Sequence, residues 1–200
     1  MYKRQGEINT LKGNVNWMKV HEEEMFDSNY DNMENLKPVI PEGNSDSASL
    51  DNVFELLSMS GHSAPLTKLM LIPDAWSKKS KILPKNQLKL FNFLNSTMEP
   101  WDGPAALAGT DNEWVIAASD RNGLRPLRFT ITRDKLLFAG SETGMVDLNE
   151  KKIIRKGRLG PGEIIGVRIE KGKVFTNSQI KDYLAKEYKL SLIHIYAADD

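Results

Sequence analysis

Residues 102–142 read DGPAALAGTDNEWVIAASDRNGLRPLRFTITRDKLLFAGSE. Short apolar runs alternate here with turn signals at the spacing of antiparallel hairpins. This pattern predicts strands at 105–108, 114–118, 127–131 and 135–139, and the same reading extends to 164–169 and 173–175. Because hairpins on this scale build antiparallel sheet, we expect an α+β protein with antiparallel sheets.

The residues before this segment predict helices. Ser45-Asp46-Ser47 offers N-cap chemistry, and the apolar positions after it follow the 3.6-residue period. Pro65 suits the first turn of a short helix over 66–72, and a third apolar stripe covers 87–98. A last helix is expected over 178–186 with Ser178 as its cap, whereas 22–41 reads as a solvated connection with one helical turn and 77–86 as a basic loop.

The composition excludes several classes of protein. The 200 residues contain 27 Lys plus Arg, 27 Asp plus Glu and no Cys, which excludes disulfide scaffolds, Cys-ligated zinc or iron–sulfur sites, and a thiol nucleophile within these residues. His21, His62 and His194 lack metal-ligand spacing, so no metal site is expected. The zero net charge, the lack of a long apolar run and the lack of a signal pattern predict a cytoplasmic protein without nucleic-acid or membrane partners.

The two ends share an unexpected relationship at the nucleotide level. Residues 1–5 (MYKRQ) and 190–195 (LSLIHI) can be back-translated as opposite strands of one DNA segment that resembles a sequencing-library adapter. We therefore interpret 1–5 and 190–200 as translated adapter and 6–189 as the native part. On this interpretation both native ends are truncations of a longer gene product.

Five polar, Gly-rich clusters occur in a characteristic order: GEINT at 6–10, SDS at 45–47, EPWDGPAAL at 99–107, DRNGLRPL at 120–127 and KGRLGPGE at 156–163. The order strand, DRxGxRPL, strand, Ser-Glu resembles the class II glutamine amidotransferase domain. The strings GEINTLKGNVNW, SDSASLDN and MEPWDGPAAL narrow the resemblance to the large-subunit family of glutamate synthases.

This resemblance implies an N-terminal-nucleophile fold, an αββα sandwich of antiparallel sheets between helices, here truncated. In the family an N-terminal Cys attacks glutamine, releases ammonia and leaves a thioester. The ammonia reaches a downstream flavin domain of the same chain, which aminates 2-oxoglutarate. FMN and an iron–sulfur cluster are expected in the full-length enzyme and no cofactor in this fragment. The electron donor, a small NAD(P)H-oxidising subunit or ferredoxin, stays open.

The resemblance also implies roles for four residues. Gly6 corresponds to the family's oxyanion-hole glycine, although Gln5 stands where the family has Asn. Asp46 corresponds to the carboxylate that holds the α-ammonium group of L-glutamine, with helix N-capping as its alternative role. Glu7 and Asn9 are further substrate contacts. Since the nucleophilic Cys is missing, the fragment itself is expected to be inactive.

Other motifs favour structural roles. Asp102-Gly103 and 120–126 fit turn-and-sheet geometry, and 156–162 lacks the residue order of a nucleotide-binding loop. Two alternatives stay open for the function: a non-catalytic glutamine-binding module, and the amidotransferase domain of another class II enzyme.

Overall fold

The computed structural model describes residues 3–25, 32–75 and 83–188. Within these residues, two antiparallel sheets have the strand orders β1-β2-β3-β7-β8 and β5-β4-β6. The strands are β1 (Lys3–Gly6), β2 (Ala105–Thr110), β3 (Trp114–Ser119), β4 (Arg128–Thr132), β5 (Leu137–Gly140), β6 (Ile153–Arg158), β7 (Ile164–Arg168) and β8 (Lys173–Phe175). The predicted α+β class with antiparallel sheets is confirmed.

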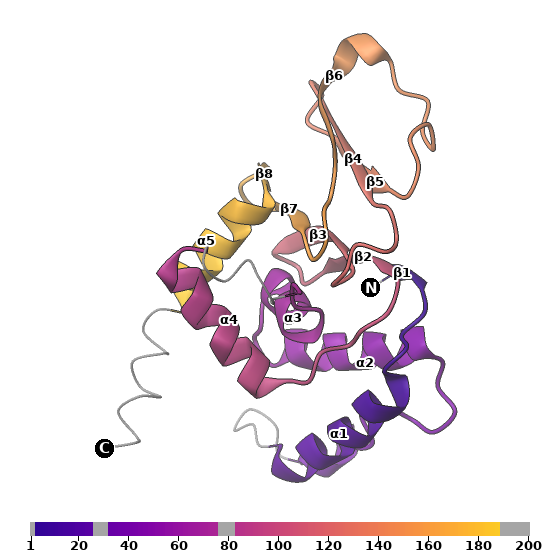
Figure 1. Ribbon diagram of the computed structural model, residues 1–200, viewed down its shortest axis with the longest axis vertical. Helices are drawn as coiled ribbons and strands as arrows, with labels where there is room; N and C mark the ends of the chain where they lie inside the picture. The colour runs from indigo at the N-terminus through magenta and orange to yellow at the C-terminus, as the bar shows by residue number, and fades with distance from the viewer. Residues whose placement is uncertain (1–2, 26–31, 76–82, 189–200) are drawn as a thin grey trace.

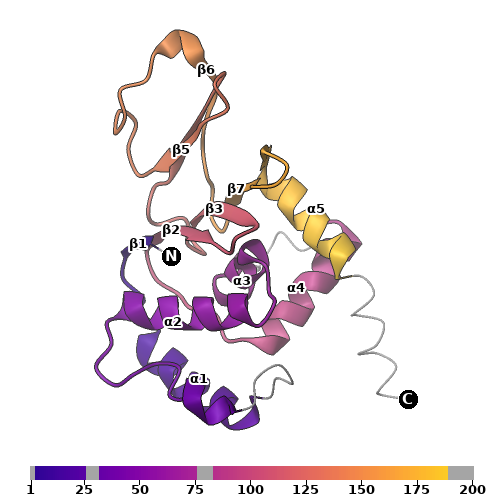
Figure 2. The same ribbon diagram turned by 180° about the vertical axis from the view of Figure 1, so that it is seen from behind.

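The helices lie on one face of the larger sheet, and the smaller sheet projects from the other side (Figures 1 and 2). The helices are α1 (Leu11–Glu24), α2 (Asp46–Met59), α3 (Ala64–Leu71), α4 (Lys85–Thr97) and α5 (Asn177–Glu187). Two short 3-10 turns, η1 (Met33–Leu36) and η3 (Glu150–Lys152), are also present. Helix α3 packs against β3, and α5 packs against β7 and α4. The main apolar core fills the space between this helical layer and the larger sheet.

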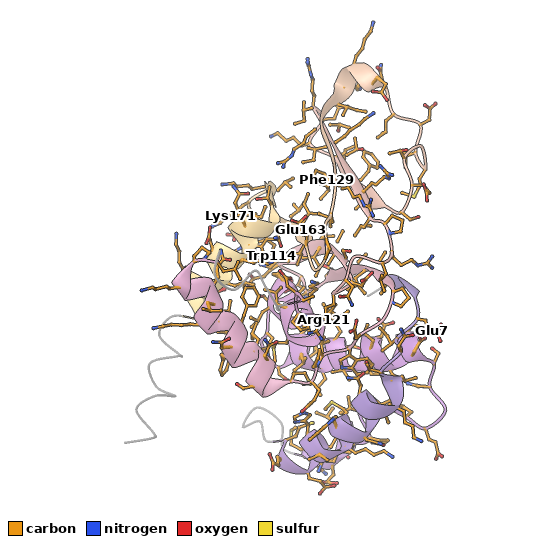
Figure 3. All side chains as sticks on the ribbon, viewed as in Figure 1. Glu7, Trp114, Arg121, Phe129, Glu163 and Lys171 are labelled. Carbon is orange, nitrogen blue, oxygen red and sulfur yellow. The ribbon has the colours of Figure 1, made fainter. Side chains whose placement is uncertain are left out.

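A second, smaller apolar cluster joins the two sheets. Leu127, Phe129 and Leu159 pack there against Ala117 of β3 and Ile165 of β7. Figure 3 shows Phe129 at the base of the projecting sheet. Within the described residues, the helical layer and the smaller sheet therefore lie on different sides of the larger sheet.

Most predicted elements have the expected boundaries to within a few residues. The side chain of Ser45 caps α2 by accepting a hydrogen bond from the Ala48 N–H. Helix α5 begins one residue earlier than predicted, and its cap is a Thr176–Gln179 capping box rather than Ser178. The predicted basic loop at 77–86 lies largely outside the described residues, since 76–82 are not described, and α4 already begins at Lys85.

One expectation was wrong in part, and one strand was not expected. The segment from Glu22 was expected to be solvated, yet α1 continues to Glu24, and the buried Glu22 carboxylate accepts a hydrogen bond from the Val39 N–H at 2.8 Å. Strand β6 was not predicted, because its sequence IIRKGR carries three cations and exposes most of its side chains. Gly157 suits this strand because a Cβ there would crowd the Phe129 ring.

Candidate functional site

The candidate site lies where β1 meets the start of β2, at two glycines that allow their backbones to touch. Gly6 has φ +137° and Gly103 has φ +150°. A Cβ at Gly6 would overlap the Pro104 carbonyl, and a Cβ at Gly103 would overlap the Glu7 carbonyl. Neither overlap can be relieved by a side-chain movement, so this approach requires glycine at both positions.

The hydrogen bonds around Gly6 fix the direction of its N–H group. Glu7 donates its backbone N–H to the Pro104 carbonyl at 3.0 Å, while Ala105 exchanges its hydrogen bonds with Asp120 rather than with Gly6. Gly6 and Ala105 are therefore a non-hydrogen-bonded pair of the antiparallel ladder. Since β1 is the edge strand, the Gly6 N–H points away from β2 toward the open edge of the sheet.

The carboxylate of Asp46 lies on this same open side. Its Oδ2 accepts the Ile8 N–H at 2.8 Å, and its Oδ1 accepts the Ser47 N–H at 2.7 Å. Ile8 is two residues beyond Gly6, so the two N–H groups are related as alternate residues of an extended chain. Asp46 does not provide the N-cap, because Ser45 does, and its half-buried carboxylate instead connects α2 to the loop after β1.

Glu7 and Asn9 flank this point through their backbones. The Asn9 N–H donates to the Asp102 carbonyl at 2.8 Å. Both residues are exposed, and Glu7 lies at the margin of the molecule beside β1 (Figure 3). The structure thus brings Gly6, Glu7, Asn9 and Asp46 together at one edge of the larger sheet.

Asp120 organises the opposite side of the β1–β2 junction. Its carboxylate, in a residue that is 1% exposed, accepts N–H groups from Ala105, Asn122, Leu124 and Arg125 at 2.9–3.2 Å. Its own carbonyl accepts the N–H groups of Gly123 and Gly162. This geometry agrees with the turn-and-sheet interpretation of 120–126, because every contact holds a backbone in place.

A buried cationic cluster supports the same loops, and the sequence offered no signal for it. The Lys68 ammonium donates to the Gly162 carbonyl at 2.8 Å, and Lys181 pairs with Asp74 at 2.6 Å. Desolvation by burial lowers the pKa of Lys68 to about 8, a change that nearby Lys181 reinforces and that Asp74 and Asp120 oppose. As the pH rises, Lys68 therefore loses its proton at a lower pH in the folded chain than in the unfolded chain.

This difference predicts that the chain becomes more stable as the pH rises from about 8 to about 10.5. Below that window both states bind the proton and the folded state carries the burial cost; within it only the unfolded state stays protonated. The free energy of unfolding should gain up to about 3 kcal/mol from Lys68. Urea titrations across this range, compared with Lys68→Met, isolate the contribution. A variant with the same pH dependence as the unsubstituted chain would contradict it.

The sequence offers no thiolate ligand for an iron–sulfur cluster. The sequence has no Cys, and the described residues hold no group of three or more His, Asp or Glu side chains that could bind a metal ion. His21 instead lies 2.7 Å from Glu99, and the His62 ring lies 3.2 Å from the Leu57 carbonyl, while His194 is outside the described residues. Across the described helices, none combines the length and apolar character that a membrane crossing requires.

Comparison with known proteins shows similarity to glutamine amidotransferases and glutamate synthases. The family model for class-II glutamine amidotransferases matches residues 1–191. The chain is 54% identical over 186 residues to the glutamate synthase [NADPH] large chain of Azospirillum brasilense and 42% identical over 186 residues to ferredoxin-dependent glutamate synthase 2 of Synechocystis. Each alignment covers 92% of this chain but only 12% of the relative.

Among solved structures, the chain is similar to the glutamine phosphoribosylpyrophosphate amidotransferase of B. subtilis. The identity is 22%, the TM-score is 0.44, and the match covers 88% of this chain and 28% of that one. A glutamine aminotransferase class-II domain protein from Silicibacter pomeroyi matches with a TM-score of 0.41 and 15% identity, over 84% of this chain and 63% of that one.

Proposed function

Because this chain belongs to the class II glutamine amidotransferases, we propose that it forms part of the domain that releases ammonia from L-glutamine in a glutamate synthase large subunit. The identities to the glutamate synthases of two bacteria support the narrower assignment. The chain spans 12% of the length of these relatives, so the reductive amination of 2-oxoglutarate to L-glutamate belongs to the proposal for the longer polypeptide.

One observation supports the glutamine site most strongly: the Gly6 N–H and the Asp46 carboxylate face the same open edge of β1. We assign the Gly6 N–H to the oxyanion that forms when a thiolate attacks the side-chain amide of glutamine. We assign Asp46 to the α-ammonium group of the same substrate. Two residues of extended chain span about 7 Å, which suits the length of a glutamine side chain between these two contacts.

The reaction that we assign proceeds in two steps. A thiolate adds to the amide carbon, and ammonia leaves after the amide nitrogen gains a proton, which yields a glutamyl thioester. Water then cleaves the thioester to glutamate and regenerates the thiol. This sequence contains no Cys, so the thiol must come from residues outside it, and the 200 residues alone should not form the thioester. Glu7 and Asn9 are assigned as further contacts around the substrate.

The remaining assignments concern the longer polypeptide. We propose a downstream flavin domain in the same chain that carries FMN and an iron–sulfur cluster and receives the ammonia. Relatives named for NADPH and for ferredoxin match over the same share of this chain, so both a small NAD(P)H-oxidising subunit and ferredoxin stay open as electron donors. We also propose a cytoplasmic location.

Calorimetric titration with L-glutamine tests the assigned site. Asp46→Asn should weaken binding at least about tenfold, because a charge-assisted contact to the ammonium group is worth about 1.5–3 kcal/mol. Glu55→Gln is the matched control, since it makes the same charge change on the exposed face of the same helix. Equal affinity for the Asp46 variant and this control would contradict the assignment.

A non-catalytic glutamine-binding module is the second candidate, and the absence of Cys together with Asp46 favours it. The two candidates predict the same titration. They differ in an ammonia-release assay of the longer polypeptide, where the enzyme should release ammonia from glutamine and the binding module should release none.

A further inference from the structure

We propose that Thr10 and Asn14 are positioning residues for the glutamine site, which they hold in shape by fastening the segment 100–103 to the first turn of α1. This inference rests on the proposed function. Neither residue is among the assigned substrate contacts, which are Gly6, Glu7, Asn9 and Asp46.

A directed chain of hydrogen bonds carries the inference. The Thr10 hydroxyl donates to Asn14 Oδ1 at 2.6 Å and accepts the Asp102 N–H at 3.0 Å. Asn14, which is 5% exposed, donates from Nδ2 to the Pro100 carbonyl at 3.1 Å. The Asp102 N–H can only donate and the Pro100 carbonyl can only accept, so Thr10 and Asn14 have one possible orientation each.

The Thr10 hydroxyl bonds to this network and does not cap α1. Thr10 is the N-cap residue of α1, a position where a threonine hydroxyl ordinarily accepts an N–H from the first turn. Here its side chain makes no capping hydrogen bond, and the hydroxyl bonds to Asp102 and Asn14 instead. The first turn of α1 therefore lacks a side-chain capping hydrogen bond, and Thr10 instead holds a segment more than 90 residues away in the sequence.

The fastened segment controls the backbone of the site. The Asp102 carbonyl accepts the Asn9 N–H, and Gly103 lies against the Glu7 carbonyl. If Asp102 and Gly103 moved, the peptide units of residues 6–9 would lose the surface that sets their direction. The Gly6 N–H and the Ile8 N–H that bonds to Asp46 would then no longer face the edge in register. Because Thr10 itself is exposed, water can replace its hydroxyl, and the loss should fall on the site rather than on overall stability.

Thr10→Val tests this inference because it removes the hydroxyl and keeps the shape. Thr10→Ser retains the hydroxyl and serves as the rescue variant. Thr97→Val, which removes an exposed threonine hydroxyl bonded to the Phe93 carbonyl in α4, is the matched control. For each, the dissociation constant of L-glutamine is measured by calorimetry, together with the hydrogen-exchange rate of the Asp102 amide by NMR.

We expect Thr10→Val to weaken glutamine binding about tenfold, the equivalent of one lost hydrogen bond, and to accelerate exchange of the Asp102 amide. Thr10→Ser should restore both, and Thr97→Val should change neither. Faster exchange with unchanged affinity would contradict the inference, since the network would then be merely structural, as would no change in either quantity. A failure of the unsubstituted chain to bind glutamine would contradict the proposed function itself, and the inference with it.

Discussion

Asp120→Ala is expected to lower the free energy of unfolding by about 3–5 kcal/mol, the range for breaking a buried charged network by removing one partner. The substitution leaves four backbone N–H groups without their acceptor, of which the Ala105 N–H is buried and those of Asn122, Leu124 and Arg125 are part-buried. It also removes one of the two carboxylates, those of Asp74 and Asp120, that offset part of the burial cost of Lys68. Urea denaturation followed by circular dichroism measures the loss.

Asp134→Ala is the control for this prediction, because it removes the same group from an exposed ion pair with Lys152. An exposed pair contributes about 0–1 kcal/mol, so the two aspartates should differ clearly. Asp120→Asn should be intermediate, since its NH₂ group faces donors while its oxygen still accepts. A loss below about 1 kcal/mol for Asp120→Ala would show that the four hydrogen bonds do not hold the β1–β2 junction.

The second large effect is expected at Gly103. In Gly103→Ala the new Cβ overlaps the Glu7 carbonyl, and the residue has φ +150°, where L-residues are strained. Since the obstacle is backbone, β1 and the following loop must move. We expect a loss of about 3 kcal/mol or more in unfolding free energy together with loss of glutamine binding, measured by denaturation and calorimetry.

Gly43→Ala separates conformational strain from this overlap. Gly43 also has a positive φ, +81°, but no atom lies within 4 Å of the position that its Cβ would take. Gly43→Ala should therefore lower the free energy of unfolding by about 1–2 kcal/mol, the penalty for a left-handed alanine alone, and leave glutamine binding intact. Equal losses at the two positions would argue against a close approach at Gly103.

The sequence predicted those elements whose signals are local. These signals are the apolar period and the Ser45 cap of α2, the proline at the start of α3, and the short apolar runs of β2 and β3 with the turn residues beside them. Strand β6 was missed because an edge strand with exposed cations has no apolar alternation to reveal it. The burial of Glu22 could not be predicted, because nothing in its local sequence shows that Val39 folds back onto it.

In the candidate site too, residues in local motifs could be predicted and contacts between distant residues could not. Gly6 and Asp46 were predicted as site residues because they belong to motifs, whereas no motif indicated the hydrogen bonds around them. Thr10 contacts Asp102, and Lys68 contacts Gly162, across more than 90 residues of sequence. Partners at such separations are brought together by the strand order of the sheets, which no local pattern encodes.

An amide NMR map of L-glutamine binding to this chain tests most directly whether the open edge of β1 holds the substrate. The largest shift changes should fall on Gly6, Glu7 and Ile8 and on the first turn of α2 around Asp46. Changes confined to another surface, such as the projecting sheet of β4, β5 and β6, or no changes at saturating glutamine, would contradict the claim that the open edge of β1 is the glutamine site.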